Sequence, residues 1–240
     1  MIPKKIHYCW FGKNKKSKLI KKCIKSWHKI CPDFEIIEWN EDNFDVNVCE
    51  YTKQAYENKK WAFVSDYCRF YVLEKFGGIY LDTDVELLKP LDGFLSSPFA
   101  GFEKGDSVNT GLIMGCDACD SLCRAMLQEY NSDKFVIDGS LNLKTVCERV
   151  TAYLCKYGLE LNNTTQKVEN YVIYDSTYFN PFDMDTGKVN LTENSVSIHH
   201  YAASWCSRRS RARGRIYRIL CRLFGKKFAD RVRGKFGRKR

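Results

Sequence analysis

Two aspartates, Asp82 and Asp84, end the apolar segment Gly77-Gly-Ile-Tyr-Leu-Asp-Thr-Asp84 and are separated by one residue. We predict a strand over residues 79–85, on which side chains at i and i+2 point to the same face. Neighbouring carboxylates repel each other unless a cation lies between them, and bound Mg²⁺ or Mn²⁺ keeps positions for water and substrate phosphates. The pair therefore predicts a divalent-metal site, with an acid-rich turn at a strand end as the structural alternative.

A second charged pair precedes this motif, in residues 61–76, which are apolar on almost all sides and end at Gly77 and Gly78. Such a segment predicts a buried helix with glycine at its C-terminus. Asp66 and Arg69 lie at i and i+3 within it, so the helix is expected to hold two charges in a dry place. The pair is either an intrahelical ion pair or a binding pair, in which Arg69 faces a phosphate and Asp66 accepts a sugar hydroxyl.

The elements that must position these residues alternate between strands and helices, which predicts an α/β layered domain. Residues 1–207 have the length of one compact domain with a core, followed by a tail over residues 208–240. Strands or extended segments are expected at residues 5–11, 34–39, 79–85, 99–103, 110–114, 171–174 and 195–201. Helices are expected at residues 17–30, 48–59, 61–76, 118–130 and 141–157.

The formal charge of +10 is unevenly distributed along the 240 residues. Residues 208–240 contain 15 Lys or Arg and one acid, Asp230, so the tail carries +14 and residues 1–207 carry −4. Eight apolar residues recur in the tail at intervals of three and four: Ile216, Ile219, Leu220, Leu223, Phe224, Phe228, Val232 and Phe236. This pattern predicts an amphipathic helix lying on an anionic membrane, with a solvated disordered tail as the alternative.

The composition excludes several classes of protein. An apolar share of 44% with 14 Tyr, 15 Phe and 5 Trp excludes a disordered chain. No apolar run approaches the roughly 20 residues of a membrane span, and the first residues lack the apolar core of a signal peptide, so we expect a cytosolic protein. Nucleic-acid binding is not expected, because residues 1–207 are acidic and show no RNA-binding signature.

The 12 cysteines are expected to be mostly buried thiols in a reducing compartment. Cys116, Cys119 and Cys123 have the spacing of one helix face, and no second cysteine pair or histidine follows at the distance of a zinc finger. Helix packing is therefore favoured here over a zinc or redox site.

Ordered blocks spanning residues 1–205 resemble glycosyltransferase family 32, the DXD sugar-binding transferases. The family includes bacterial capsular-polysaccharide enzymes and relatives of fungal mannosyltransferases, and is distantly similar to the glucosylating clostridial toxins. The matching blocks are Ile2-Pro-Lys-Lys-Ile-His-Tyr-Cys-Trp-Phe-Gly12, Ser26-Trp27, Cys31-Pro32, Trp39-Asn-Glu-Asp-Asn43, Ala62-Phe-Val-Ser-Asp-Tyr-Cys-Arg69, Gly77-Gly-Ile-Tyr-Leu-Asp-Thr-Asp84 and Ile198-His-His-Tyr-Ala-Ala-Ser-Trp205.

The resemblance implies a GT-A fold, a Rossmann-like sheet that binds a nucleotide sugar at the carboxyl ends of its strands. By position in the motifs, Trp10 would stack on the base, while Asp66 and Arg69 would hold the donor sugar and the diphosphate. Tyr80 and Asp82 would contact the ribose region.

The resemblance also implies a metal site, in which Asp84 binds Mn²⁺ or Mg²⁺ directly and Asp82 assists directly or through water. His199 or His200 would supply a late ligand, with His199 favoured. Three further positions would complete the donor site: Asn109 on a sugar, and Ser204 and Trp205 over the diphosphate. Trp10 and Trp205 have core packing as their alternative.

The predicted function is that of a metal-dependent retaining transferase, which moves a hexose from a nucleotide sugar to a saccharide acceptor. We expect a UDP-linked donor and a lipid-linked acceptor in surface polysaccharide synthesis, with the tail holding the enzyme peripherally on the inner face of the membrane. One alternative is phosphoryl transfer at a haloacid-dehalogenase-like Asp-x-Asp, although Glu86 stands where Thr or Val is usual. The other is a non-enzymatic binder of anionic membrane or nucleic acid.

Overall fold

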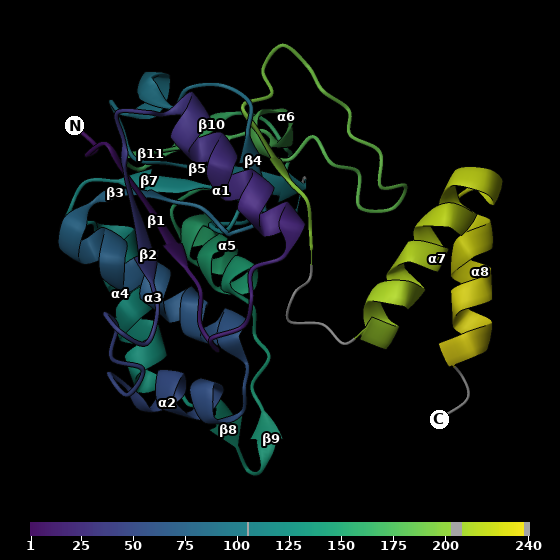
Figure 1. Ribbon diagram of the computed structural model, residues 1–240, viewed down its shortest axis with the longest axis horizontal. Coiled ribbons are helices and arrows are strands. Elements are labelled where there is room, and N and C mark those ends of the chain that lie inside the picture. The colour runs from purple at the N-terminus through teal and green to yellow at the C-terminus, as the bar shows by residue number, and fades with distance from the viewer. Residues whose placement is uncertain (105, 203–207, 238–240) are drawn as a thin grey trace.

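One mixed sheet organises the main domain in the computed structural model, which describes residues 1–104, 106–202 and 208–237 (Figure 1). Seven of its eight strands lie in the order β10 (Gln166–Val168), β11 (Tyr171–Tyr174), β5 (Phe99–Lys104), β7 (Met114–Cys116), β3 (Gly78–Tyr80), β1 (Lys5–Cys9) and β2 (Glu35–Trp39). The eighth, β6 (Ser107–Val108), pairs with β5, and β12 (Ser197–His199) pairs separately with β4 (Val85–Leu87). The α/β class predicted from the sequence is confirmed.

The half of the sheet nearest β2 is parallel, because β1 pairs in parallel with both β2 and β3. Helix α1 (Lys18–Ile30) connects β1 to β2, and α2 (Glu50–Glu57) and α3 (Trp61–Phe76) connect β2 to β3. This strand–helix–strand order places the carboxyl ends of β1, β2 and β3 at one edge, which is where open α/β sheets bind ligands. The other half is largely antiparallel, with β7 between β3 and β5.

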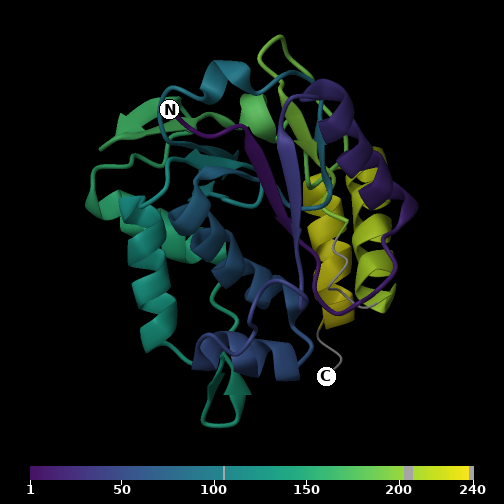
Figure 2. The ribbon, with the colours of Figure 1, turned by 60° about the vertical axis from the view of Figure 1, so that its left-hand side comes forward.

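Two hydrophobic cores lie against the sheet, and neighbouring residues of its strands alternate between them. Ile79 belongs to the core beneath α1, whereas Tyr80 belongs to the core shared with α2, α3, α4 (Ser121–Ser132) and α5 (Val146–Lys156). The side chains on both faces of the sheet are buried, as expected for strands that helices cover on both sides. The remaining short elements are η1 (Asp92–Phe94), α6 (Ser176–Phe179) and the hairpin of β8 (Val136–Ile137) and β9 (Ser140–Leu141), visible in Figure 2 at the tip below α2.

The prediction of one strand over residues 79–85 is wrong. The chain leaves the sheet after Tyr80, and the backbone N–H of Val85 donates to the carbonyl of Asp82 at 3.0 Å, which closes a turn before β4. Asp82 and Asp84 therefore lie in a turn and not on one face of a strand. The cause is long-range, since β4 pairs antiparallel with β12 and not with the main sheet.

Three further boundaries differ from prediction because of capping side chains and turns. Residues 110–112 form a turn, so the strand expected at 110–114 begins only at Met114. Helix α4 starts at Ser121 because Asp120 caps its N-terminus, and α5 starts at Val146 behind the Thr145 cap. The expected helical residues around 141 instead form the β8–β9 hairpin.

The interpretation of Cys116, Cys119 and Cys123 as one helix face is also wrong. Cys116 ends β7, Cys119 lies in the following turn with φ +62°, and only Cys123 lies in α4. The Sγ atoms of Cys116 and Cys123 nevertheless lie 3.8 Å apart in the buried core, so two of the three thiols do pack together.

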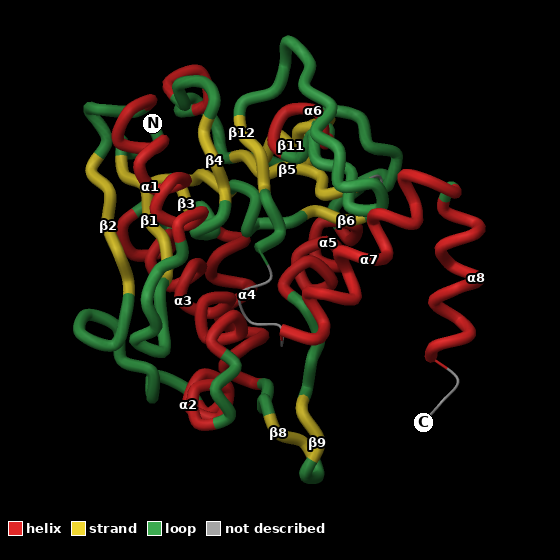
Figure 3. The backbone as a smooth tube through the Cα atoms, turned by 45° about the vertical axis from the view of Figure 1, so that its right-hand side comes forward, coloured by secondary structure: helices red, strands yellow, loops and turns green. Residues whose placement is uncertain are grey.

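The tail forms two helices where the sequence predicted one. Helices α7 (Arg208–Phe224) and α8 (Lys226–Gly237) are separated by Gly225 at φ +78° and form an antiparallel hairpin beside the main domain (Figures 1 and 3). Glycine adopts this left-handed conformation without steric cost, which explains the break. The predicted domain boundary at residue 207 lies outside the described residues. Within the described part of the chain, no helix has the length and apolarity that a membrane span requires.

Candidate functional site

The carboxylate of Asp84 lies at the centre of a set of buried contacts formed between the turn and β12. Its Oδ1 lies 3.0 Å from Nε2 of His199, and its Oδ2 accepts the backbone N–H of Ala202 at 2.6 Å. Burial disfavours the charged form of Asp84, but the attraction and hydrogen bond of His199 outweigh it and lower the pKa of Asp84 to about 2. Asp84 is therefore a fixed anion at neutral pH.

His199 is buried beside Asp84 and keeps one ring nitrogen without a partner. Burial opposes its protonation, yet the charge of Asp84 raises the pKa of His199 above its ordinary value. Among the described residues, Nδ1 of His199 has no hydrogen-bond partner. Nε2 of His199 and Oδ1 of Asp84, 3.0 Å apart, are an imidazole nitrogen and a carboxylate oxygen, a donor pair that suits a divalent cation.

His200 has a different environment from His199. Its Nε2 lies 2.8 Å from Oε2 of Glu86, a carboxylate that also binds Lys22. Only the backbone of His200 contacts Asp84, through an N–H to carbonyl hydrogen bond of 3.0 Å. The structure thus brings the side chain of His199, the histidine favoured from the sequence, to Asp84.

Asp82 is held by a separate set of contacts on the main-sheet side of the turn. Its Oδ1 accepts from Nη2 of Arg69 at 3.3 Å and from the hydroxyl of Tyr80 at 3.1 Å. Its other oxygen faces Gly111, where an added Cβ would lie 2.1 Å from Oδ2. Tyr80 is buried, with its hydroxyl on Asp82 and its ring against the guanidinium of Arg69, and its contact with the ribose region stays a prediction.

Arg69 connects the helix α3 to the turn through a buried guanidinium. Its Nη2 lies 2.7 Å from Oδ1 of Asp66 and contacts Asp82, its Nη1 donates to Thr110 at 3.3 Å, and its plane lies 4.7 Å above the ring of Tyr80. Burial raises the pKa of Asp66 to about 6, although the Arg69 charge opposes this. One cation therefore serves two carboxylates. The predicted buried pair exists, and it extends to Asp82.

Asn109 lies against the same turn, on the side of β5. Its Oδ1 accepts the N–H of Gly111 at 2.7 Å, and its Nδ2 donates to Glu103 at 3.0 Å. Glu103 also accepts the hydroxyl of Tyr201 at 3.0 Å, and the Tyr201 ring centre lies 4.1 Å from that of His199. Four residues of this site had no role predicted from the sequence: Glu103, Thr110, Gly111 and Tyr201. The signals were the Asn-Thr-Gly turn beside Asn109 and the block of residues 198–205, which contains Tyr201.

The remaining predicted residues lie at the sheet edge or outside the described chain. Trp10 follows β1 and is half-buried. Its backbone N–H donates to the carbonyl of Trp39 at the end of β2 at 2.8 Å, and its ring N–H donates to the carbonyl of Asn14 at 2.7 Å. Its stacking role stays a prediction. Ser204 and Trp205 lie outside the described residues.

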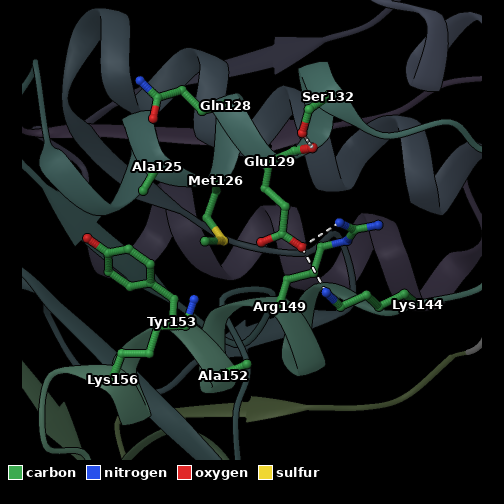
Figure 4. Close-up of a pocket in the computed structure, with 10 residues that line it drawn as sticks. All are labelled: Ala125, Met126, Gln128, Glu129, Ser132, Lys144, Arg149, Ala152, Tyr153 and Lys156. Atoms are coloured by element: carbon green, nitrogen blue, oxygen red, sulfur yellow. Dashed lines mark hydrogen bonds and ion pairs between the residues drawn. The ribbon is translucent and has the colours of Figure 1, made fainter.

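Two other features of the described chain carry no comparable site. Figure 4 shows a hollow between α4 and α5, in which Glu129 accepts from both Lys144 and Arg149. The charged groups of this hollow are therefore paired with one another.

Cys116, Asp120 and Cys123 have ligand atoms within 4.8 Å of one another. Asp120, however, already caps α4 and accepts from Tyr171, and burial raises the pKa of the Cys123 thiol. A thiol whose protonated form is favoured, beside a carboxylate that is already hydrogen-bonded, favours packing over metal binding.

Part of the chain that carries these residues is similar to known proteins. Residues 17–100, which include Asp66, Arg69, Asp82 and Asp84, match the family described as "Glycosyltransferase sugar-binding region containing DXD motif". The chain is 30% identical over 108 residues to "Inositol phosphoceramide mannosyltransferase 3" of Schizosaccharomyces pombe, covering 40% of this chain and 28% of that relative. The chain thus spans little more than a quarter of the curated relative it matches.

Two solved structures are similar to the chain at low sequence identity. "PaToxG Glycosyltransferase" is 20% identical, covers 63% of this chain and 68% of its own, and has a TM-score of 0.47. A glycosyltransferase involved in glycosylation of the major capsid of PBCV-1 is 13% identical, covers 86% and 96%, and has a TM-score of 0.49. Residues 17–100 thus match the DXD-containing sugar-binding region of glycosyltransferases, which bears out, for this part of the chain, the family resemblance seen in the sequence.

Proposed function

We propose that this chain transfers a hexose from a nucleotide sugar to a saccharide acceptor, with Mn²⁺ or Mg²⁺ as its metal. The observation that carries the proposal is the arrangement of Asp84 with His199 and of Asp82 with Arg69 around one turn of the DXD region. Acids that recruit a cation and an arginine that binds phosphate are the groups that a diphosphate leaving group requires. The family match favours glycosyl over phosphoryl transfer.

Asp84 and His199 would hold the metal directly. Asp82 would bind the metal through water. Among the described side chains, its carboxylate oxygens do not lie within 4.8 Å of both the ligand oxygens of Asp84 and the ring nitrogens of His199. When bound, the ion supplies positive charge to the departing diphosphate.

Arg69 would supply the second charge, at a fixed position set by Asp66 and Thr110. A preorganised cation of this kind stabilises charge that develops on the leaving oxygen without reorganising. Among the described residues, the carboxylates around the turn are those of Asp66, Asp82, Asp84 and Glu103, and each is engaged in hydrogen bonds. We therefore propose that the acceptor hydroxyl attacks the anomeric carbon on the face that the diphosphate leaves, with retention. The bond to the diphosphate oxygen breaks as the new glycosidic bond forms, and the departing diphosphate takes the hydroxyl proton.

UDP is the proposed nucleotide, on the basis of the family resemblance. The relative from Schizosaccharomyces pombe is named as a mannosyltransferase, so GDP-mannose is the donor to test beside the UDP-hexoses. A lipid-linked acceptor in surface polysaccharide synthesis completes the proposal.

Metal removal provides the first test. The full chain with Mn²⁺ is expected to release nucleoside diphosphate from one member of a panel of UDP-hexoses and GDP-mannose. EDTA should abolish that release, and Mn²⁺ should restore it, because Asp84 and His199 cannot neutralise the diphosphate alone. Release that persists in EDTA would refute the metal assignment. Hydrolysis of a generic phosphoester, with no sugar donor consumed, would refute the transferase.

Gly111→Ala provides a second test, of the position of Asp82. The new Cβ would meet Oδ2 of Asp82 at 2.1 Å, so the carboxylate must move away from Arg69 and Tyr80. The displaced carboxylate changes its contacts with Arg69 and Tyr80, and displacements of about 1 Å can cost a hundredfold in rate. We therefore expect a loss of about ten- to a hundredfold in donor turnover, with a melting temperature lowered by only a few degrees. Gly93→Ala, whose added Cβ meets nothing within 4 Å, is the matched control. Full activity in Gly111→Ala would show that Asp82 is not part of the machinery.

A further inference from the structure

The α7–α8 hairpin presents an exposed apolar surface, here named the tail patch. It consists of five residues, of which Leu223 is 68% and Phe224 59% exposed: Ile216, Ile219, Leu223, Phe224 and Phe228. Ile216, Ile219 and Leu223 lie at i, i+3 and i+7, so they share one face of α7. The rings of Phe224 and Phe228 lie 5.0 Å apart across the bend at Gly225, which continues the surface onto α8. A contiguous set of large apolar side chains in water indicates an interaction site.

Apart from the contact between Phe224 and Phe228 at the bend, the hairpin packs through other residues. The two helices meet through Cys221 and Ala229, both buried, and through the hydroxyl of Tyr217, which donates to Asp230 at 2.8 Å. Arg233 covers the other side of the Tyr217 ring, with its guanidinium 4.8 Å from the ring centre. The tail patch is therefore left over after the helix–helix contact has formed.

The main domain contacts a different, basic face of α7. Arg222 of α7 donates to the carbonyls of Thr186 and Gly187, and Lys226, the first residue of α8, lies 2.7 Å from the carboxylate of Asp185. Arg218 lies one turn before Arg222 and its side chain packs against Gly187. Because these contacts hold the basic face of α7 toward the domain, the tail patch stays free on the neighbouring face.

The charge of the tail identifies the partner. Residues 208–240 hold 15 Lys or Arg, and the one acid, Asp230, is already engaged by Tyr217 and Arg233. Association of two tail patches from two copies would bring like charges of +14 together, which opposes a dimer. Stacking on nucleic acid would leave the aliphatic side chains Ile216, Ile219 and Leu223 without a role. An anionic lipid surface fits both the positive charge of the tail and its exposed apolar side chains. Its headgroups attract the cations, and its acyl boundary accepts the apolar side chains.

We propose that the α7–α8 hairpin docks this chain on an anionic membrane by inserting the tail patch at the level of the headgroups. Docking does not depend on the proposed transferase chemistry, so each can fail alone. If both hold, the hairpin brings the DXD turn to a surface on which a lipid-linked acceptor lies, and it places the protein peripherally on the membrane.

Sedimentation of the full chain with vesicles tests the proposal. Phosphatidylcholine vesicles with about a third of anionic phosphatidylglycerol should bind the chain, neutral phosphatidylcholine vesicles should bind it at least about tenfold more weakly, and salt should weaken the anionic binding. The double variant Ile219→Ser/Leu223→Ser should lower the binding about tenfold or more. Ile137→Ser/Leu161→Ser, which removes two aliphatic residues exposed to about the same degree on the main domain, should leave it unchanged.

Three outcomes would overturn the proposal. Equal binding to neutral vesicles would remove the role of charge, and unchanged binding of the tail variant would remove the role of the patch. A dimer that forms without vesicles, and that the tail variant dissociates, would make the patch an interface between copies. Donor turnover, measured in the same samples without lipid, should be equal in the two double variants and the unmodified chain, which separates a failed docking site from a failed enzyme.

Discussion

Replacing Asp84 by asparagine is expected to reduce donor turnover by at least about a thousandfold, because the variant removes the fixed negative charge at the proposed metal site. The carboxylate is ionised at neutral pH, with a pKa of about 2, and His199 lies 3.0 Å away. Asparagine keeps the shape of the side chain and one oxygen. It loses the anion, which is the property that a divalent cation requires.

The fold should survive this change at a modest cost. Asparagine has one side-chain oxygen where aspartate has two. Either the N–H of Ala202 or Nε2 of His199 would therefore face an NH₂ group in place of an oxygen acceptor, which costs about 1–3 kcal/mol of the free energy of unfolding. Thermal unfolding and donor turnover measured on the same preparation separate the two effects. Asp92→Asn, at an exposed carboxylate paired with Lys4, is the control that should change neither. Turnover within about tenfold of the unmodified chain, at saturating Mn²⁺, would exclude Asp84 as a metal ligand.

Local signals in the sequence predicted the helix that carries Arg69 and the strand that ends just before Trp10. The helix expected at residues 61–76 has those bounds in the structure, since its apolar surface and the two glycines after it are properties of adjacent residues. The strand ahead of Trp10 and the helix capped by Ser17 were recognisable for the same reason. The buried pair of Asp66 and Arg69 followed from placing two charges on an apolar helix.

The geometry of the acids could not be predicted, because it depends on contacts between distant parts of the chain. The turn at Asp82 exists because β4 leaves the main sheet to pair with β12, more than 100 residues later in the sequence. That pairing also brings His199 to Asp84 and Tyr201 to Glu103. An isolated apolar segment with two aspartates resembles a continuous strand, and its period-two pattern gives no sign of where a later strand will pair.

The tail shows the same limit in a simpler form. Its apolar spacing predicted helix correctly, but one continuous amphipathic helix and a hairpin broken at Gly225 have the same periodicity. The choice between them depends on packing of Tyr217 and Cys221 against α8, which the spacing alone does not encode.

Replacing Arg69 by methionine is expected to affect both stability and activity. The variant leaves Asp66 buried without its cation, and breaking a buried pair in this way costs about 3–5 kcal/mol of the free energy of unfolding. Loss of the guanidinium should raise the pKa of Asp66 further above its value of about 6 and release Asp82 from its contact. Donor turnover should fall at least about a hundredfold, as for the loss of a preorganised charge on a leaving group.

The double variant Arg69→Met/Asp66→Asn decides between the two interpretations of the pair. Removing both charges relieves the uncompensated carboxylate, so the melting temperature should recover most of the loss, whereas turnover should stay low because no cation faces the diphosphate. A purely structural ion pair would instead recover turnover together with stability. Arg149→Met is the matched control, since Arg149 is as buried and is paired with Glu129 and Asp133 away from the turn. It should lower stability to a similar extent while the folded fraction keeps its turnover. That contrast would assign Arg69 to the reaction, because the two arginines share burial and pairing and differ in their proximity to the DXD turn.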